Sequence, residues 1–106
     1  MPMAGEKSRH VKIYGLHVRD GDLYRRYREG MTPLLHRQGG AFGYDFVVSD
    51  VLKSEAKAQI NRVFTITFPD ASVADRFFTD PEYLAVRKEF FEPAVGDVTV
   101  IGAYDE

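Results

Sequence analysis

The chain has 106 residues, enough for one domain with a single hydrophobic core. It carries 14 basic and 16 acidic residues, a net charge of −2, which argues against a nucleic-acid or membrane-surface partner. It has no cysteine, so disulfides, thiolate nucleophiles and cysteine-bound zinc are excluded, and we expect a cytoplasmic protein. No apolar run approaches the length of about 20 residues that spans a bilayer.

The first residues predict a short tail ahead of one folded domain. Residues 1–10 lack the apolar central stretch of a secretory signal, and we expect them to form a flexible N-terminal tail. Residues 11–106 are expected to form a single domain. Its first strand is predicted at residues 11–18 (VKIYGLHV), because β-branched and aromatic residues dominate this segment.

The next segment predicts a long helix. Apolar residues recur at helical spacing over residues 23–38, with Asp22 as the expected N-cap. Pro33 lies inside this pattern and is expected to kink the helix, because proline has no N–H to donate. Gly39 and Gly40 should end it, since glycine adopts the left-handed conformation of a C-cap without strain.

Two strands are predicted in the middle of the chain. The first covers residues 42–52 (FGYDFVVSDVL), and a polar connection over residues 53–60 follows it. One face of this strand is expected to carry Phe42, Tyr44, Phe46 and Val48. Residues 62–68 (RVFTITF) alternate between large apolar and smaller residues, which is typical of a half-buried strand.

The remaining elements complete a β-α-β-β-α-β order. Ser72 and Asp75 predict a capping-box start for a second helix, and Asp80-Pro81 predicts a restart of that helix in a new direction. Residues 98–103 (VTVIGA) are the last predicted strand. This order predicts an α+β fold, a ferredoxin-like sandwich with a four-stranded antiparallel sheet and helices on one face.

The sheet face without helices is expected to be apolar. In the first strand, Val11 and Ile13 share one face, while Tyr14, Leu16 and Val18 share the other. Monomers seldom expose an apolar patch larger than a few hundred Å². We therefore expect a second copy of the chain to cover this face, giving a homodimer.

Several short motifs occur together and suggest a family. They are Tyr24-x-x-Tyr27, Pro33, Gly39-Gly40, Phe68-Pro69, Ser72-x-Ala74 and Asp80-Pro81-Glu82-Tyr83. In this combination, covering most of residues 14–103, the chain resembles the family of domain of unknown function 1330, in the dimeric α+β barrel superfamily. The resemblance implies a ferredoxin-like protomer and a dimer whose two sheets face each other to form a barrel. It implies no activity.

The chain departs from the family pattern at two places. The family usually has an arginine about seven residues after the tyrosine of the Asp-Pro-Glu-Tyr motif, and here Phe90 occupies that position. Residues 53–59 replace an acidic, glycine-containing hairpin. Superfamily relatives include cofactor-independent oxygenases, isomerases, decarboxylases and haem proteins, and fold analogy alone cannot choose between them.

Five polar side chains are candidates for binding a ligand. They are Tyr14, His17, Tyr44, Arg62 and Tyr83. Arg62 has the parity of Phe64 in its strand and is expected to hold a negative group, while His17 or a tyrosine manages a proton. Apolar walls with a few polar groups favour a small, partly aromatic or carboxylated ligand. The alternative is that these tyrosines are core aromatics and His17 is a structural histidine.

No motif calls for a metal or an organic cofactor. The three histidines lack metal-ligand spacing, and Asp20-Gly21-Asp22 lacks the later ligands of a calcium loop. A haem protein would need His17 or His36 as the axial ligand. Two functions therefore stay open: a small-molecule-binding protein or cofactor-independent enzyme with its site between sheet and helices, and a non-catalytic structural or stress-linked dimer.

Overall fold

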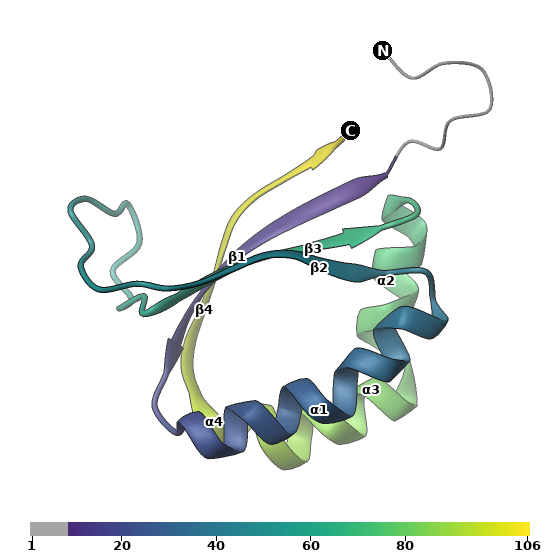
Figure 1. Cartoon of the computed structure of the whole chain (residues 1–106), viewed down its shortest axis with the longest axis horizontal. Coiled ribbons are helices and arrows are strands. Elements are labelled where there is room, and N and C mark those ends of the chain that lie inside the picture. Colours follow the sequence, from purple (N-terminus) through teal and green to yellow (C-terminus); the bar gives the residue numbers. More distant parts are fainter. Residues whose placement is uncertain (1–8) are drawn as a thin grey trace.

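A computed structural model describes residues 9–106 of the chain, which alternate between strands and helices as predicted (Figure 1). The elements are β1 (His10–Val18), α1 (Gly21–Arg37), β2 (Ala41–Val47), β3 (Arg62–Phe68), α2 (Ala71–Thr79), α3 (Pro81–Val86), the π-helix η1 (Arg87–Phe91), α4 (Glu92–Ala94) and β4 (Val95–Asp105). The predicted tail lies largely outside the described residues. The prediction that His10 belongs to the tail is wrong: His10 begins β1, where it pairs with Phe68 and Asp105.

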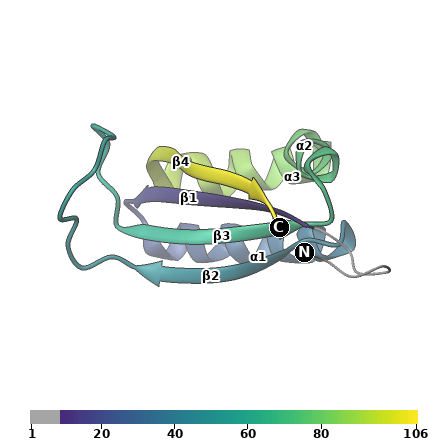
Figure 2. The same ribbon diagram turned by 90° about the horizontal axis from the view of Figure 1, so that it is seen from above.

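The four strands form one antiparallel sheet in the order β2-β3-β1-β4. The helices cover one face of this sheet (Figure 1), and the view onto the opposite face shows the strands in front of the helices (Figure 2). The predicted α+β sandwich with helices on one face is therefore confirmed. No helix in residues 9–106 is long and apolar enough to cross a membrane.

The helix α1 begins two residues earlier than the sequence pattern indicated. Its N-cap is Asp20, not Asp22: the Asp20 carboxylate accepts a hydrogen bond of 3.1 Å from the Leu23 N–H. Pro33 lies inside the helix, as predicted. After the helix, Gly39 has a φ of 81°, so the expected left-handed glycine is present.

Beside α1, the rest of the helical layer consists of short segments. The helix α2 is capped by Asp70, not Ser72, because the Asp70 carboxylate accepts from the Val73 N–H at 2.9 Å. Asp80 caps α3 at the predicted restart and accepts from the Glu82 N–H at 2.8 Å. The chain then continues through η1 and α4 into β4.

The strand β2 is shorter than predicted, and a β-bulge divides it. Phe42 pairs with Ile66 and Asp45 pairs with Phe64. Phe42 and Asp45 are three residues apart in β2, whereas Ile66 and Phe64 are two residues apart in β3, so β2 contains one extra residue. The extra residue reverses the facing of the side chains that follow it. The prediction of one aromatic face was therefore wrong: Phe42 packs toward the helices, and Tyr44 lies on the open face.

The core lies between the helices and the sheet. Its most buried large side chains are Phe68, Phe77, Leu16, Met31 and Leu35. The open face keeps several exposed apolar side chains, namely Tyr44, Phe46, Ile101 and Tyr104. The strand face that carries Leu16 is thus the covered one, and the opposite face is available to a partner.

Candidate functional site

A pocket of about 310 Å³ lies between the sheet and the helices, beside β4. Three strands (β1, β3 and β4) and four helical segments (α1, α2, α3 and η1) line it. The lining residues are Lys12, Tyr14, Leu16, Tyr27, Phe64, Ile66, Phe78, Tyr83, Arg87, Phe91, Val98 and Val100. Most of this wall is apolar, and its polar atoms are three hydroxyls and two cationic groups, which is the usual composition of a small-molecule site.

Two of the hydroxyls are hydrogen-bonded to each other. The Tyr27 and Tyr83 hydroxyl oxygens are 2.9 Å apart, and both side chains are buried. Asp80 and Pro81 start α3 at a defined point, so Tyr83 projects from its first turn toward Tyr27 on α1. In such a pair one hydroxyl donates and the other accepts, which leaves one proton available to a ligand oxygen.

The tyrosine hydroxyls of this pocket remain protonated at neutral pH. Burial raises the pKa of Tyr14 to about 12, and the neighbouring Tyr83 adds to the effect. Burial likewise raises the pKa of Tyr27, and it raises the pKa of Tyr83. These groups therefore act as hydrogen-bond donors to an acceptor, and they are poor bases.

The two cations of the pocket are Arg87 and Lys12. Arg87 follows Tyr83 by one helical turn, and its guanidinium carbon is 5.2 Å from the centre of the Phe91 ring. Lys12 places its ammonium nitrogen 5.4 Å from the centre of the Phe78 ring. Within residues 9–106, no carboxylate comes within 4.0 Å of either cation. A negative group of a ligand would thus meet positive charge without displacing a protein carboxylate.

Only two of the five predicted site residues meet in this pocket. Tyr14 and Tyr83 line it, whereas Arg62 lines a separate pocket on the other side of α1. Tyr44 is 66% exposed on the open sheet face. His17 lies beside Gly96 near the end of β1. The ligand-binding role of these residues stays a prediction.

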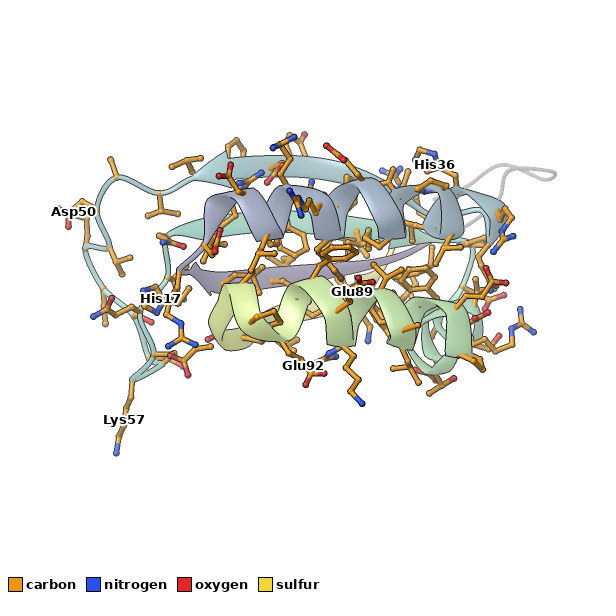
Figure 3. All side chains as sticks on the ribbon, turned by 90° about the horizontal axis from the view of Figure 1, so that it is seen from below. His17, His36, Asp50, Lys57, Glu89 and Glu92 are labelled. Atoms are coloured by element: carbon orange, nitrogen blue, oxygen red, sulfur yellow. The ribbon has the colours of Figure 1, made fainter. Side chains whose placement is uncertain are left out.

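The histidines are well separated. Figure 3 shows His17 close to the loop that carries Asp50 and Lys57, and His36 at the opposite end of the molecule. Among residues 9–106, no group of three or more histidine, aspartate or glutamate side chains is placed to hold a metal ion.

Three polar residues of the pocket were absent from the predicted set: Lys12, Tyr27 and Arg87. A signal for Arg87 is present in the sequence, because it lies one helical turn from Tyr83 and thus on the same helix face. It also precedes Phe90, which stands where the resembled family usually has an arginine. No sequence pattern indicated that Tyr27 of α1 and Lys12 of β1 would line the same pocket as Arg87 of η1.

The fold and this pocket define a ferredoxin-like α+β protein with a cleft between its sheet and its helices. A protein of unknown function from Rhodopseudomonas palustris is similar over 95% of this chain and 82% of its own, with a TM-score of 0.72 and 18% identity. A dimeric ferredoxin-like protein of unknown function from Jannaschia sp. is similar over 92% of this chain and 97% of its own, with a TM-score of 0.58 and 14% identity.

A third similar structure is SnoaB, a cofactor-independent oxygenase from Streptomyces nogalater. The similarity extends over 94% of this chain and 92% of the SnoaB chain, with a TM-score of 0.53 and 13% identity. At these identities the similarities establish the fold alone. No curated protein matches the chain. Residues 12–104 match the family described as domain of unknown function (DUF1330), and the chain therefore belongs to this family, as its motifs predicted.

Proposed function

We propose that this protein binds a small, partly aromatic molecule with a carboxylate or similar negative group in the pocket between sheet and helices. The observation that carries the proposal is the position of Arg87. Its guanidinium lines an apolar pocket together with three protonated tyrosine hydroxyls, and no carboxylate within residues 9–106 neutralises it. Of the predicted site residues, Tyr14 and Tyr83 belong to this proposed site.

Each part of the pocket has a role in the proposal. Arg87 holds the negative group, because a guanidinium offers several N–H donors in a plane that suits a carboxylate. The aromatic part of the ligand packs against Phe64, Phe78 and Phe91. Tyr14 and the Tyr27–Tyr83 pair donate hydrogen bonds to oxygen atoms of the ligand.

The same arrangement suits a reaction without a cofactor. Protonated hydroxyls beside an arginine stabilise negative charge that develops on a ligand oxygen, and they do so most strongly in a partly dehydrated pocket. SnoaB, which shares the fold, is a cofactor-independent oxygenase. That similarity supports a reaction without a cofactor in this fold.

We also propose that the protein acts as a homodimer through the open sheet face. The exposed apolar side chains of that face support this proposal, because water would otherwise contact them. The dimeric ferredoxin-like protein from Jannaschia sp. supports it by analogy of fold. The open face alone also favours the second candidate function, a non-catalytic structural or stress-linked dimer.

The test compares benzoate with its neutral analogue benzamide in calorimetric titrations and thermal-shift assays. We expect benzoate to bind the wild-type protein more tightly than benzamide does. Arg87→Gln should weaken benzoate binding about tenfold or more, as expected for loss of a charge-assisted hydrogen bond, and should abolish the preference over benzamide.

Arg37→Gln is the matched control, because Arg37 is an exposed arginine whose guanidinium pairs with Glu82 at 3.0 Å. It should keep the benzoate affinity of the wild type. Equal binding to the wild type and to Arg87→Gln would refute the assignment of Arg87. Failure of every small aromatic acid to bind would favour the non-catalytic dimer.

A further inference from the structure

A second pocket, of about 320 Å³, lies on the other side of α1 and shares no lining residue with the first. It is lined by Gly21, Tyr24, Arg25, Arg28 and Arg62. Three of these five residues are arginines. Arg62 was expected from the sequence to hold a negative group, and this pocket is where the structure places its side chain.

Arg28 and Arg62 converge on one carboxylate, that of Asp45. The Arg62 Nε and Nη2 groups donate to the two Asp45 oxygens at 2.8 Å and 2.9 Å, and the Arg28 Nη2 group donates at 2.9 Å. The bulge in β2 turns Asp45 toward the helices and so makes this arrangement possible. Two guanidinium groups are therefore already oriented for anion recognition.

Aromatic rings hold both guanidinium groups in place. The guanidinium carbon of Arg28 is 3.7 Å from the centre of the Phe42 ring, and that of Arg62 is 5.3 Å from the centre of the Tyr24 ring. The side chains of Arg28 and Arg62 are only 18% and 27% exposed. The geometry of the pair is thus set before any ligand arrives, which reduces the entropy that binding would cost.

Positive charge and donors remain after Asp45 is satisfied. Two guanidinium groups around one carboxylate leave one net positive charge. Each guanidinium has five N–H groups. Within residues 9–106, Arg28 uses one of them for the Tyr24 hydroxyl and one for Asp45, and Arg62 uses two for Asp45. Arg25 pairs with two exposed carboxylates, Asp22 and Glu29, so the excess positive charge is local to Arg28 and Arg62 and is not a net charge of all the residues around the pocket.

We propose that this second pocket binds the phosphate group of a small molecule or free inorganic phosphate. The donors that remain on the two guanidinium groups require several acceptors. Asp45 and the Tyr24 hydroxyl take four of the ten N–H groups of Arg28 and Arg62, so six remain, divided between two guanidinium groups on different elements, α1 and β3. A tetrahedral oxyanion offers acceptors in several directions, whereas a carboxylate offers only two oxygens in one plane.

The competing interpretation is a purely structural ion-pair cluster that ties α1 to β2 and β3. The two interpretations differ in the expected effect of Asp45→Asn. In a phosphate site this change removes a competing negative charge and frees donors, so phosphate affinity should rise. In a structural cluster the change only loosens the contacts between α1 and the two strands.

The experiment measures phosphate binding by calorimetry and thermal shift, with potassium chloride at matched ionic strength as the reference. We expect phosphate to stabilise the wild type beyond the chloride reference. Arg28→Gln and Arg62→Gln should each weaken phosphate binding about tenfold or more. Asp45→Asn should bind phosphate more tightly than the wild type, a result that does not depend on whether either arginine variant folds.

Three further measurements complete the test. Arg37→Gln should keep wild-type phosphate affinity, and so should Arg87→Gln, which separates this site from the aromatic-acid pocket. Phenyl phosphate that binds more tightly than inorganic phosphate would identify a phosphorylated metabolite as the ligand, and equal affinity would identify free phosphate. Equal stabilisation by phosphate and matched chloride, or no gain of affinity in Asp45→Asn, would overturn the proposal.

Discussion

The hydroxyl oxygens of Tyr27 and Tyr83 lie 2.9 Å apart and join α1 to α3 inside the core. The Tyr27 ring centre is 4.8 Å from that of Phe91, and the Tyr83 ring centre is 4.6 Å from that of Phe77. The aromatic rings thus pack α1 against η1 and α2 against α3, and the hydroxyl pair joins α1 to α3 beside the pocket.

This relationship predicts coupled stability effects. Tyr27→Phe and Tyr83→Phe should each lower the free energy of unfolding by about 1 kcal/mol, because each leaves a buried hydroxyl without its partner. The double variant should cost less than the sum of the two, with a coupling of at least about 0.5 kcal/mol. Urea denaturation of the wild type and the three variants measures these effects. Strictly additive losses would mean that the bond contributes no net stability.

The tyrosines also predict a loss of stability in alkaline solution. Burial raises the pKa of Tyr14 from 10.0 to about 12, and the pKa values of Tyr27 and Tyr83 are raised as well. Between pH 10 and pH 12 the folded state therefore keeps protons that the unfolded state has lost. The free energy of unfolding should be independent of these groups below pH 10 and should fall as the pH rises toward 12.

Denaturation curves at a series of alkaline pH values, together with the ultraviolet absorbance of tyrosinate, measure this effect. Tyr14→Phe should reduce the slope of stability against pH, because one of the shifted groups is removed. A stability that stays flat across this pH range in the wild type would contradict the assigned burial of the tyrosines.

The proposed dimer predicts a particular mass and a particular set of sensitive residues. Light scattering should give about twice the chain mass of 12.1 kDa. Phe46→Asp and Ile101→Asp should yield folded monomers, because both side chains are about half exposed on the open face of the protomer. Leu84→Asp should leave the dimer intact, since Leu84 is exposed on α3, in the helical layer.

A wild-type protein that is monomeric at micromolar concentration would exclude this dimer. Leu16→Asp would not test it, because Leu16 is 1% exposed in the core of the protomer and a charge there would unfold the chain.

Two glycines in the turn after α1 are expected to be more sensitive to substitution by alanine than the glycine that begins α1. Gly40→Ala should cost about 1–3 kcal/mol, because the new methyl group would overlap the Leu35 side chain and lie 3.1 Å from the Thr67 carbonyl oxygen. Gly39→Ala should cost about 1–2 kcal/mol, because its φ of 81° is unfavourable for alanine. Gly21→Ala is the control and should change stability by no more than about 0.5 kcal/mol, since nothing lies within 4 Å of the added carbon. Thermal and chemical denaturation measure the series, and equal effects at the three positions would contradict this description of the turn.

Local chemistry was enough to predict the order of elements and the class of fold. The alternation of residues 62–68 gave the bounds of β3, and Asp80-Pro81 gave the start of α3, as the structure confirms. In both cases the decisive feature is short-range: a two-residue period, or a proline preceded by a capping carboxylate. The division of the β1 side chains into two faces followed from the period for the same reason, because β1 pairs with β3 without a register shift from His10 to Leu16. Which of the two faces the helices cover did not follow from the period.

The positions of Tyr44 and Asp45 depended on contacts between strands. The bulge in β2 arises in its pairing with β3, where the Tyr44 N–H donates to the Thr65 hydroxyl at 2.8 Å. A period of two in the sequence cannot reveal the residue at which the register between two strands shifts. The sequence therefore placed Tyr44 on the same face as Phe42, whereas the structure places it on the opposite face. The same shift turns Asp45 toward Arg28 and Arg62 and creates the second pocket.

The division of the candidate residues between two pockets depended on how the helices pack. The parity of a strand indicates that Tyr14 and Arg62 both face the helical layer, but Arg62 meets Tyr24 of α1 and Tyr14 meets Phe78 of α2. Which helix crosses which strand is decided by the fit of large side chains such as Phe77, Phe68 and Met31 in the core. Arg87 and Tyr27 therefore join Tyr14 in one pocket, and Arg62 lies in the other, because packing between distant segments brings them there.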